Sequence, residues 1–130
     1  MHTKVENLHY VSFSGGGTAG MAFEGIMQAI AVTMGGEKHF NTWHDEIRGV
    51  AGTSAGALYA LVFVLQRDSK KRVELGSSIR VDRIVSMTQL DRFAQTYGMS
   101  NMDELHRFVQ SVLSTCGLSP TATLQDLFRF

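Results

Sequence analysis

Two glycine-rich clusters, whose first glycines lie 37 positions apart, constrain this chain more than any other feature of its sequence. The first covers residues 15–20, Gly-Gly-Gly-Thr-Ala-Gly, and the second covers residues 52–56, Gly-Thr-Ser-Ala-Gly. Each follows a short stretch with strand character and opens an apolar or amphipathic helical pattern. Glycine permits a tight turn where a side chain would collide with neighbouring backbone. The sequence therefore predicts two strand–turn–helix units.

The second cluster is a G-x-S-x-G pattern, which places Ser54 on the turn between a strand and a helix. A serine in that position has an exposed hydroxyl on a strained backbone, as nucleophiles of acyl-transfer enzymes do. A structural alternative exists, because serine is also a preferred N-cap residue of a buried helix. Ser54 is thus the candidate nucleophile.

The first cluster presents consecutive backbone N–H groups at the start of a helix, where partial positive charge gathers. Gly15, Gly16 and Gly17 are therefore candidates for binding an oxyanion, and a nucleophile with an oxyanion site is the minimum apparatus for acyl transfer. A rival interpretation is a dinucleotide site, because Gly15, Gly17 and Gly20 also match G-x-G-x-x-G. That site needs an acidic residue about 20 positions on, at a strand end. Glu37 has nearly the right spacing but follows two glycines in a polar stretch. A purely structural tight turn is the third possibility.

The first half of the chain is interpreted as strand, helix and strand, which predicts a parallel pair of strands. A polar loop that contains Trp43 is expected between the helix and the second strand. The expected elements are a strand over 8–13, a helix over 18–34 ended by Gly35 and Gly36, the loop over 37–46, and a strand over 47–51.

The second half is interpreted as mainly helical. Residues 54–67 are apolar on nearly every side, which predicts a helix buried in the core, and residues 68–72 are expected to be a charged, solvated exit. No element is assigned to 73–87. Further helices are expected over 90–97, over 101–116 with Gly117 as its stop, and from Thr123 with Asp126 as a capping partner. The last of these is only seven residues long, so we expect the chain to be truncated there.

The order S-G-G-G-x-x-G, helix, G-x-S-x-G resembles the N-terminal part of a patatin-like phospholipase domain. Residues 13–20 and 50–58 carry the resemblance, and similarity extends from about Val11 to the last residue. The whole of 1–130 is interpreted as the N-terminal portion of one such domain, with its motifs within about 8–67. The resemblance implies a three-layer α/β/α fold with a mainly parallel central sheet.

The resemblance also implies an activity, that of a lipid acyl hydrolase with a Ser–Asp dyad acting on lipid esters at a membrane or lipid surface. It makes Ser54 the nucleophile and Gly15, Gly16 and Gly17 the oxyanion hole, with Gly20, Gly52 and Gly56 as motif glycines. No cofactor and no metal are implied.

Two departures from the family pattern bear on activity. Ala19 stands where the family usually has Arg or Lys, and the D-G-G or D-G-A motif that carries the family's aspartate is missing. No aspartate of the chain is followed by glycine: Asp45, Asp68, Asp82, Asp91, Asp103 and Asp126. The alternatives are therefore an inactive fragment that binds lipid or a partner protein, and a nucleotide-binding domain. A Ser–His–Asp triad would have to use His106, the histidine that follows Ser54.

Composition argues against several classes of protein: nucleic-acid-binding, metal-binding, secreted and membrane-spanning. Twelve basic and twelve acidic residues give a net charge of zero, which argues against a nucleic-acid partner. The single cysteine, Cys116, has no metal-binding spacing around it, and nothing assigns His39 or His44 to a metal. The N-terminus lacks a signal-peptide core, and the apolar run over 57–65 is far shorter than the ~20 residues of a spanning helix. We expect an intracellular protein, cytoplasmic or peripheral to a membrane.

Overall fold

The computed structural model describes residues 4–16, 22–78 and 102–129 of the chain. The chain divides into two compact units, residues 1–77 and residues 78–130. Both glycine clusters belong to the first, which also holds the sheet.

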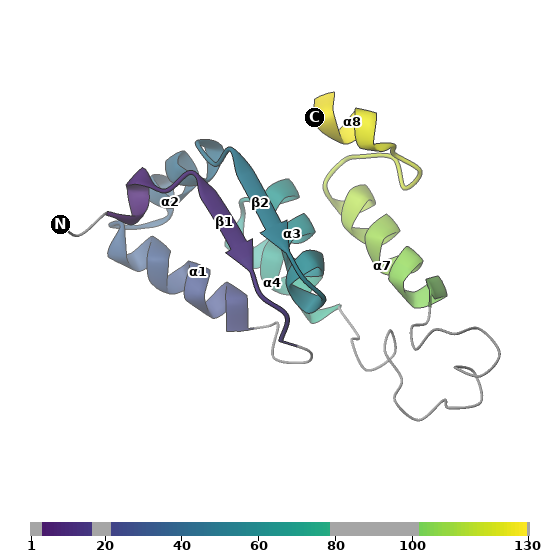
Figure 1. Cartoon of the computed structure of the whole chain (residues 1–130), viewed down its shortest axis with the longest axis horizontal. Helices are drawn as coiled ribbons and strands as arrows, with labels where there is room; N and C mark the ends of the chain where they lie inside the picture. The colour runs from purple at the N-terminus through teal and green to yellow at the C-terminus, as the bar shows by residue number, and fades with distance from the viewer. Residues whose placement is uncertain (1–3, 17–21, 79–101, 130) are drawn as a thin grey trace. The chain divides into compact units, whose positions relative to one another are not determined.

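The sheet of the first unit pairs β1 (Tyr10–Phe13) with β2 (Gly49–Gly52), and the two strands are parallel. The register runs from Tyr10 opposite Gly49 to Phe13 opposite Gly52, so both strands end at the same edge. Figure 1 shows the two arrows pointing the same way. The predicted parallel strand–helix–strand unit is confirmed. A short 3₁₀ turn, η1 (Val5–Asn7), precedes β1.

Helix α1 (Ala22–Thr33) ends where the sequence predicts, at Gly35 and Gly36. Gly35 has a φ of 97°, a left-handed conformation that costs a residue without Cβ little. The Gly36 N–H donates to the Ala31 carbonyl at 2.8 Å and the Gly35 N–H to the Val32 carbonyl at 3.0 Å. These two bonds form a Schellman C-cap, which satisfies carbonyls at the helix end.

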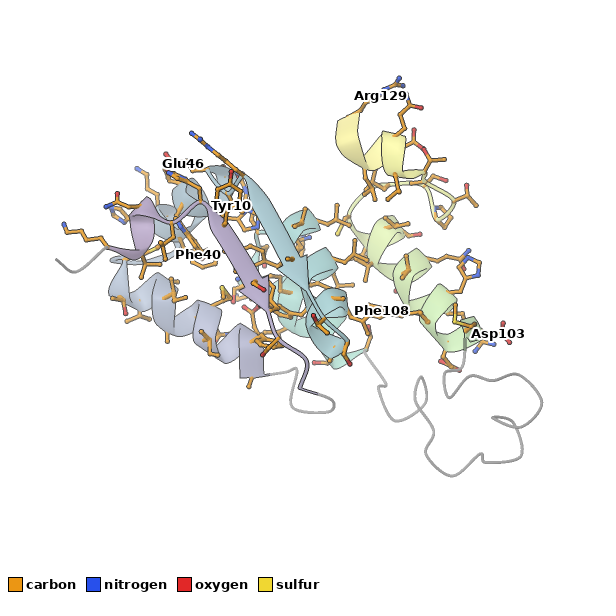
Figure 2. All side chains as sticks on the ribbon, in the orientation of Figure 1. Tyr10, Phe40, Glu46, Asp103, Phe108 and Arg129 are labelled. Atoms are coloured by element: carbon orange, nitrogen blue, oxygen red, sulfur yellow. The ribbon has the colours of Figure 1, made fainter. Side chains whose placement is uncertain are left out.

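The prediction of a polar loop over residues 37–46 is wrong, because the segment forms helix α2 (Glu37–Asp45). Most of its polar residues face solvent, while Phe40 (Figure 2) and Trp43 are 1% and 4% exposed. The two aromatic residues lie three positions apart and therefore on one helix face. Two such side chains bury enough apolar area to stabilise a helix whose other residues favour water.

Helix α3 (Ala55–Leu65) follows β2 and packs on both strands, as the predicted buried helix. Its side chains meet those of β1 and α1 in an aromatic cluster. The Phe13 ring lies edge-on to the rings of Tyr59, Phe23 and Phe63 at centroid distances of 5.0, 5.4 and 5.4 Å. Edge-to-face pairs of this kind add to the free energy of apolar burial. The hydrophobic core of the first unit therefore lies against α3, the helix that begins within the second glycine cluster.

The prediction that residues 68–72 form a charged, solvated segment after the buried helix is also wrong. Helix α4 (Ser69–Ser77) begins there, with the Asp68 carboxylate accepting a hydrogen bond from the Lys71 N–H at 3.0 Å. Arg72 is only 1% exposed, because a partner carboxylate on another helix neutralises its charge. The sequence did not indicate that Arg72 is buried, because it is the one buried residue in a run of charged residues.

The second unit contains α7 (Met102–Thr115) and α8 (Leu124–Arg129). Gly117 ends α7 with a φ of 84°, as the sequence predicts. The predicted cap of α8 is present, because the Asp126 N–H donates to the Thr123 hydroxyl and the Thr123 N–H donates back to the Asp126 carboxylate. The helix expected over 90–97 and the Asn101 cap lie outside the described residues.

The described residues thus form a mixed α/β structure with a two-stranded parallel sheet. A three-layer arrangement around a larger sheet stays a prediction.

Candidate active site

Ser54 lies between the end of β2 and the start of α3, on a backbone that serine rarely adopts. Its φ is 55° and its ψ is −128°, and it is the one residue other than glycine with positive φ among the described residues. Such conformations cost on the order of 1–3 kcal/mol and persist only where surrounding structure enforces them. The strained strand-to-helix turn expected of a G-x-S-x-G motif is therefore present.

The glycines that flank Ser54 leave no room for a side chain. A Cβ on Gly52 would lie 2.6 Å from the Cα of Ala57, and a Cβ on Gly56 would overlap the carbonyl oxygens of Phe13 and Ser14. The first turn of α3 therefore packs directly against the backbone at the end of β1. This close approach is the physical reason for both glycines of the motif.

The same packing brings the first glycine cluster to Ser54. A Cβ on Gly15 would lie 3.4 Å from the Ser54 Cβ, and the Thr53 N–H donates to the Phe13 carbonyl at 3.1 Å. Gly15, Gly16 and Ser54 are all exposed to solvent. Gly17 and Gly20 lie outside the described residues. The structure thus joins the candidate nucleophile to the described part of the candidate oxyanion loop.

The geometry disfavours the interpretation of Ser54 as an N-cap. An N-cap residue normally has extended backbone, and its side chain accepts a hydrogen bond from the first helical turn. Ser54 has positive φ, and its hydroxyl makes no such bond. The Ser54 hydroxyl therefore makes no hydrogen bond that caps α3.

The dinucleotide interpretation also lacks its structural context. The acidic partner in that motif follows a second strand, whereas Glu37 begins α2, which follows α1 directly after the turn at residues 34–36. His106, the triad alternative, is exposed on α7 in the second unit.

Four carboxylates of the described residues have partners other than Ser54. Glu24 is buried among polar side chains of α3 and α4, and Asp45 pairs with Arg67 at 2.7 Å. Asp68 and Asp126 cap helices, and hydrogen bonds from those helix starts lower the pKa of both carboxyl groups. Among the described residues, no hydrogen bond joins the Ser54 side chain to a carboxylate or an imidazole. None of these four carboxylates is therefore placed as a proton acceptor for Ser54.

The described residues hold neither a metal-binding cluster nor a membrane-spanning helix. Within 4–16, 22–78 and 102–129, no three histidine, cysteine or acidic side chains lie close enough together to hold a metal ion. No helix in those ranges has the length and apolar character needed to cross a bilayer.

A serine on a strained strand-to-helix turn beside a glycine loop is the kind of arrangement found in α/β serine hydrolases. The family model of patatin-like phospholipases matches residues 11–124, and this chain belongs to that family. Its members hydrolyse ester bonds of lipids. Comparisons with curated proteins and with solved structures found no match. The matched segment crosses both compact units, while their assignment to one domain over 1–130 stays a prediction.

Proposed function

We propose that this protein is a lipid acyl hydrolase in which Ser54 is the nucleophile. The strained backbone of Ser54 beside Gly15 is the observation that carries the proposal, because the serine is exposed there and its side chain caps no helix. In the proposed reaction the Ser54 Oγ attacks the ester carbonyl carbon and loses its proton to a carboxylate. The tetrahedral oxyanion then accepts hydrogen bonds from N–H groups of residues 15–17. The alcohol leaves with a proton, and water releases the acyl group from Ser54.

The proposed dyad partner is an aspartate, which the family pattern places in a D-G motif that this sequence lacks. General acid–base catalysis typically contributes about 10²–10⁴ to the rate. Oxyanion stabilisation contributes about 3–4 kcal/mol for each donor and does not depend on the base. We therefore expect the 130-residue chain to react at Ser54 slowly rather than not at all.

A fluorophosphonate probe tests the assignment, because it reacts covalently with activated serines. We expect slow labelling of the peptide that contains Ser54, its loss in Ser54→Ala, and unchanged labelling in Ser12→Ala, a control serine exposed on β1. Labelling that persists in Ser54→Ala would overturn the nucleophile. Loss in His106→Ala would instead establish a histidine triad.

An inactive lipid-binding module is the second candidate, and the missing D-G motif favours it. This candidate predicts flotation with phosphatidylcholine vesicles that Ser54→Ala leaves unchanged, and no probe labelling at any serine. Labelling at Ser54 would exclude it.

A further inference from the structure

Helix α3 carries the candidate nucleophile at its start, yet its sequence has no polar face that would define its rotation. Between Ala55 and Leu65, Tyr59 is the one residue with a polar side-chain group, and the other side chains are apolar on every side. Burial of apolar surface has no direction, so a helix with no polar face can rotate about its axis at little cost in hydrophobic free energy. Gly56 packs on the backbone of β1 at the start of the helix, and a directional polar interaction can define the rotation of the part that follows.

That interaction is a buried polar cluster, which we name the α1–α3–α4 cluster: Glu24, Tyr59, Ser69 and Arg72. The Arg72 Nε and Nη2 donate to the two carboxylate oxygens of Glu24 at 2.8 and 3.1 Å. Ser69 donates to Glu24 at 2.9 Å, and the Tyr59 hydroxyl donates to the same carboxylate. Glu24 thus accepts four hydrogen bonds, which is its full capacity.

Arg72 also holds the far end of α3. Its Nη1 donates to the carbonyls of Gln66 and Arg67 at 3.2 and 2.5 Å, just beyond the last helical residue. Its guanidinium carbon lies 5.1 Å from the ring centre of Phe40, a cation–π contact that joins α2 to the cluster. Burial, and after it the bond to Glu24, raises the pKa of the Tyr59 hydroxyl, so Tyr59 remains a donor at every physiological pH.

We propose that Glu24, Tyr59 and Arg72 are positioning residues that set the rotation of α3 and thereby the place of Ser54 beside Gly15. The proposal rests on the proposed function of Ser54. Hydrogen bonds are directional, unlike apolar contacts, and a fully satisfied buried cluster selects one arrangement of its helices. A helix rotation of about 20° moves an atom about 5 Å from the axis by about 2 Å. Misplacement of a reacting group by 1 Å can reduce a rate 10²-fold.

The test replaces the cluster by apolar residues of similar volume, in Glu24→Leu/Tyr59→Phe/Arg72→Met. Such replacements of buried ion pairs often keep or raise stability, so the variant is expected to fold. We expect its saturating rate constant for fluorophosphonate labelling at Ser54 to fall about tenfold, with little change in the half-saturating probe concentration. Tyr59→Phe, which keeps the Glu24–Arg72 pair, is expected to show a smaller fall.

A role in stability alone has a different signature. Partial unfolding lowers the fraction of molecules that react but leaves the rate constant of the folded ones unchanged. Trp43→Phe is the matched control, because it removes another buried hydrogen bond, from the indole to the Leu8 carbonyl at 2.8 Å, and leaves the cluster intact. It should lower stability and leave the labelling rate constant at the wild-type value. An unchanged rate constant in the triple variant would overturn the proposal.

Hydrogen exchange separates this proposal from the assignment of the nucleophile. The Gly56 and Ala57 N–H groups donate to the Thr53 and Ser54 carbonyls at 2.9 Å in the first turn of α3. The triple variant should exchange these amides at least several-fold faster than wild type, whereas Trp43→Phe should not. Faster exchange without labelling of wild-type Ser54 would overturn the nucleophile and support the positioning role. Unchanged exchange together with normal labelling would overturn the positioning role.

Discussion

Helix α3 begins against bare backbone and ends among buried polar side chains. At its start, Gly56 packs on the carbonyls of Phe13 and Ser14, and Ser54 is exposed and strained. Just beyond its other end, the Arg72 guanidinium donates to the carbonyls of Gln66 and Arg67. In the last turn of the helix, His44 Nε2–H donates to the carbonyl of Phe63 at 2.6 Å. We call the start of α3 at Ser54 the reactive end and its other end, bonded to Arg72 and His44, the anchoring end. The comparison teaches that the reactive end depends on glycines, which have no side chain, whereas the anchoring end depends on particular side chains.

The largest effect is expected at the anchoring end. Arg72→Met removes one partner of a buried ion pair and leaves Glu24 charged in the core, which typically costs about 3–5 kcal/mol. Arg67→Met removes an equally short pair with Asp45, but both side chains are 57% exposed, so we expect a loss of less than about 1 kcal/mol. Urea unfolding followed by circular dichroism measures both. Equal losses would show that burial of the cluster does not matter.

At the reactive end, Gly56→Ala should lower the free energy of unfolding by about 2–3 kcal/mol, because the new methyl group overlaps two backbone carbonyls. The control is Gly25→Ala near the start of α1, where a Cβ would meet nothing within 4 Å. That change should stabilise the chain by about 0.5–1 kcal/mol, the usual helix preference for alanine. The prediction fails if the two variants shift the urea midpoint in the same direction.

Ser54→Gly tests the strain itself. Glycine adopts positive φ freely, so we expect a gain in unfolding free energy of about 1 kcal/mol together with complete loss of probe labelling. Ser12→Gly, in the extended backbone of β1, should instead lose about 0.5–1 kcal/mol. A loss at both positions would mean that Ser54 is not strained.

The smallest expected effect is a pH dependence of the free energy of unfolding, caused by His44, which donates to the Phe63 carbonyl. Burial, reinforced by the charge of Arg72, lowers the pKa of His44 below its ordinary value of 6.5 against the opposing influence of Phe63 and Asp45. The unfolded chain then binds the proton more readily, so this contribution is complete above pH 6.5 and is lost as the pH falls below it. Between pH 7.5 and 5.5 we expect a loss of less than about 1 kcal/mol.

His44→Gln should flatten this slope, whereas His39→Gln, at an exposed position of the same helix, should leave it unchanged. Parallel slopes for wild type and His44→Gln would assign the pH dependence to other groups.

Local patterns in the sequence were enough to predict features that depend on nearby residues. The turn at Ser54, the C-cap at Gly35 and the cap between Thr123 and Asp126 each rest on a few consecutive positions. Their physics is steric and local, so residue types at fixed spacing indicate the conformation. The parallel pairing of β1 and β2 is not local, but it followed from the strand–helix–strand order, because a helical connection brings the chain back to the same end of the sheet.

Tertiary structure decided which polar residues are buried. Composition suggested that residues 37–46 and 68–72 are solvated, but Trp43 and Arg72 point into the core. The partner of Arg72 is Glu24, 48 positions earlier, and no local pattern marks that pair. A buried charge is stable only with its partner in place, and that pairing exists only once α1, α3 and α4 have packed together.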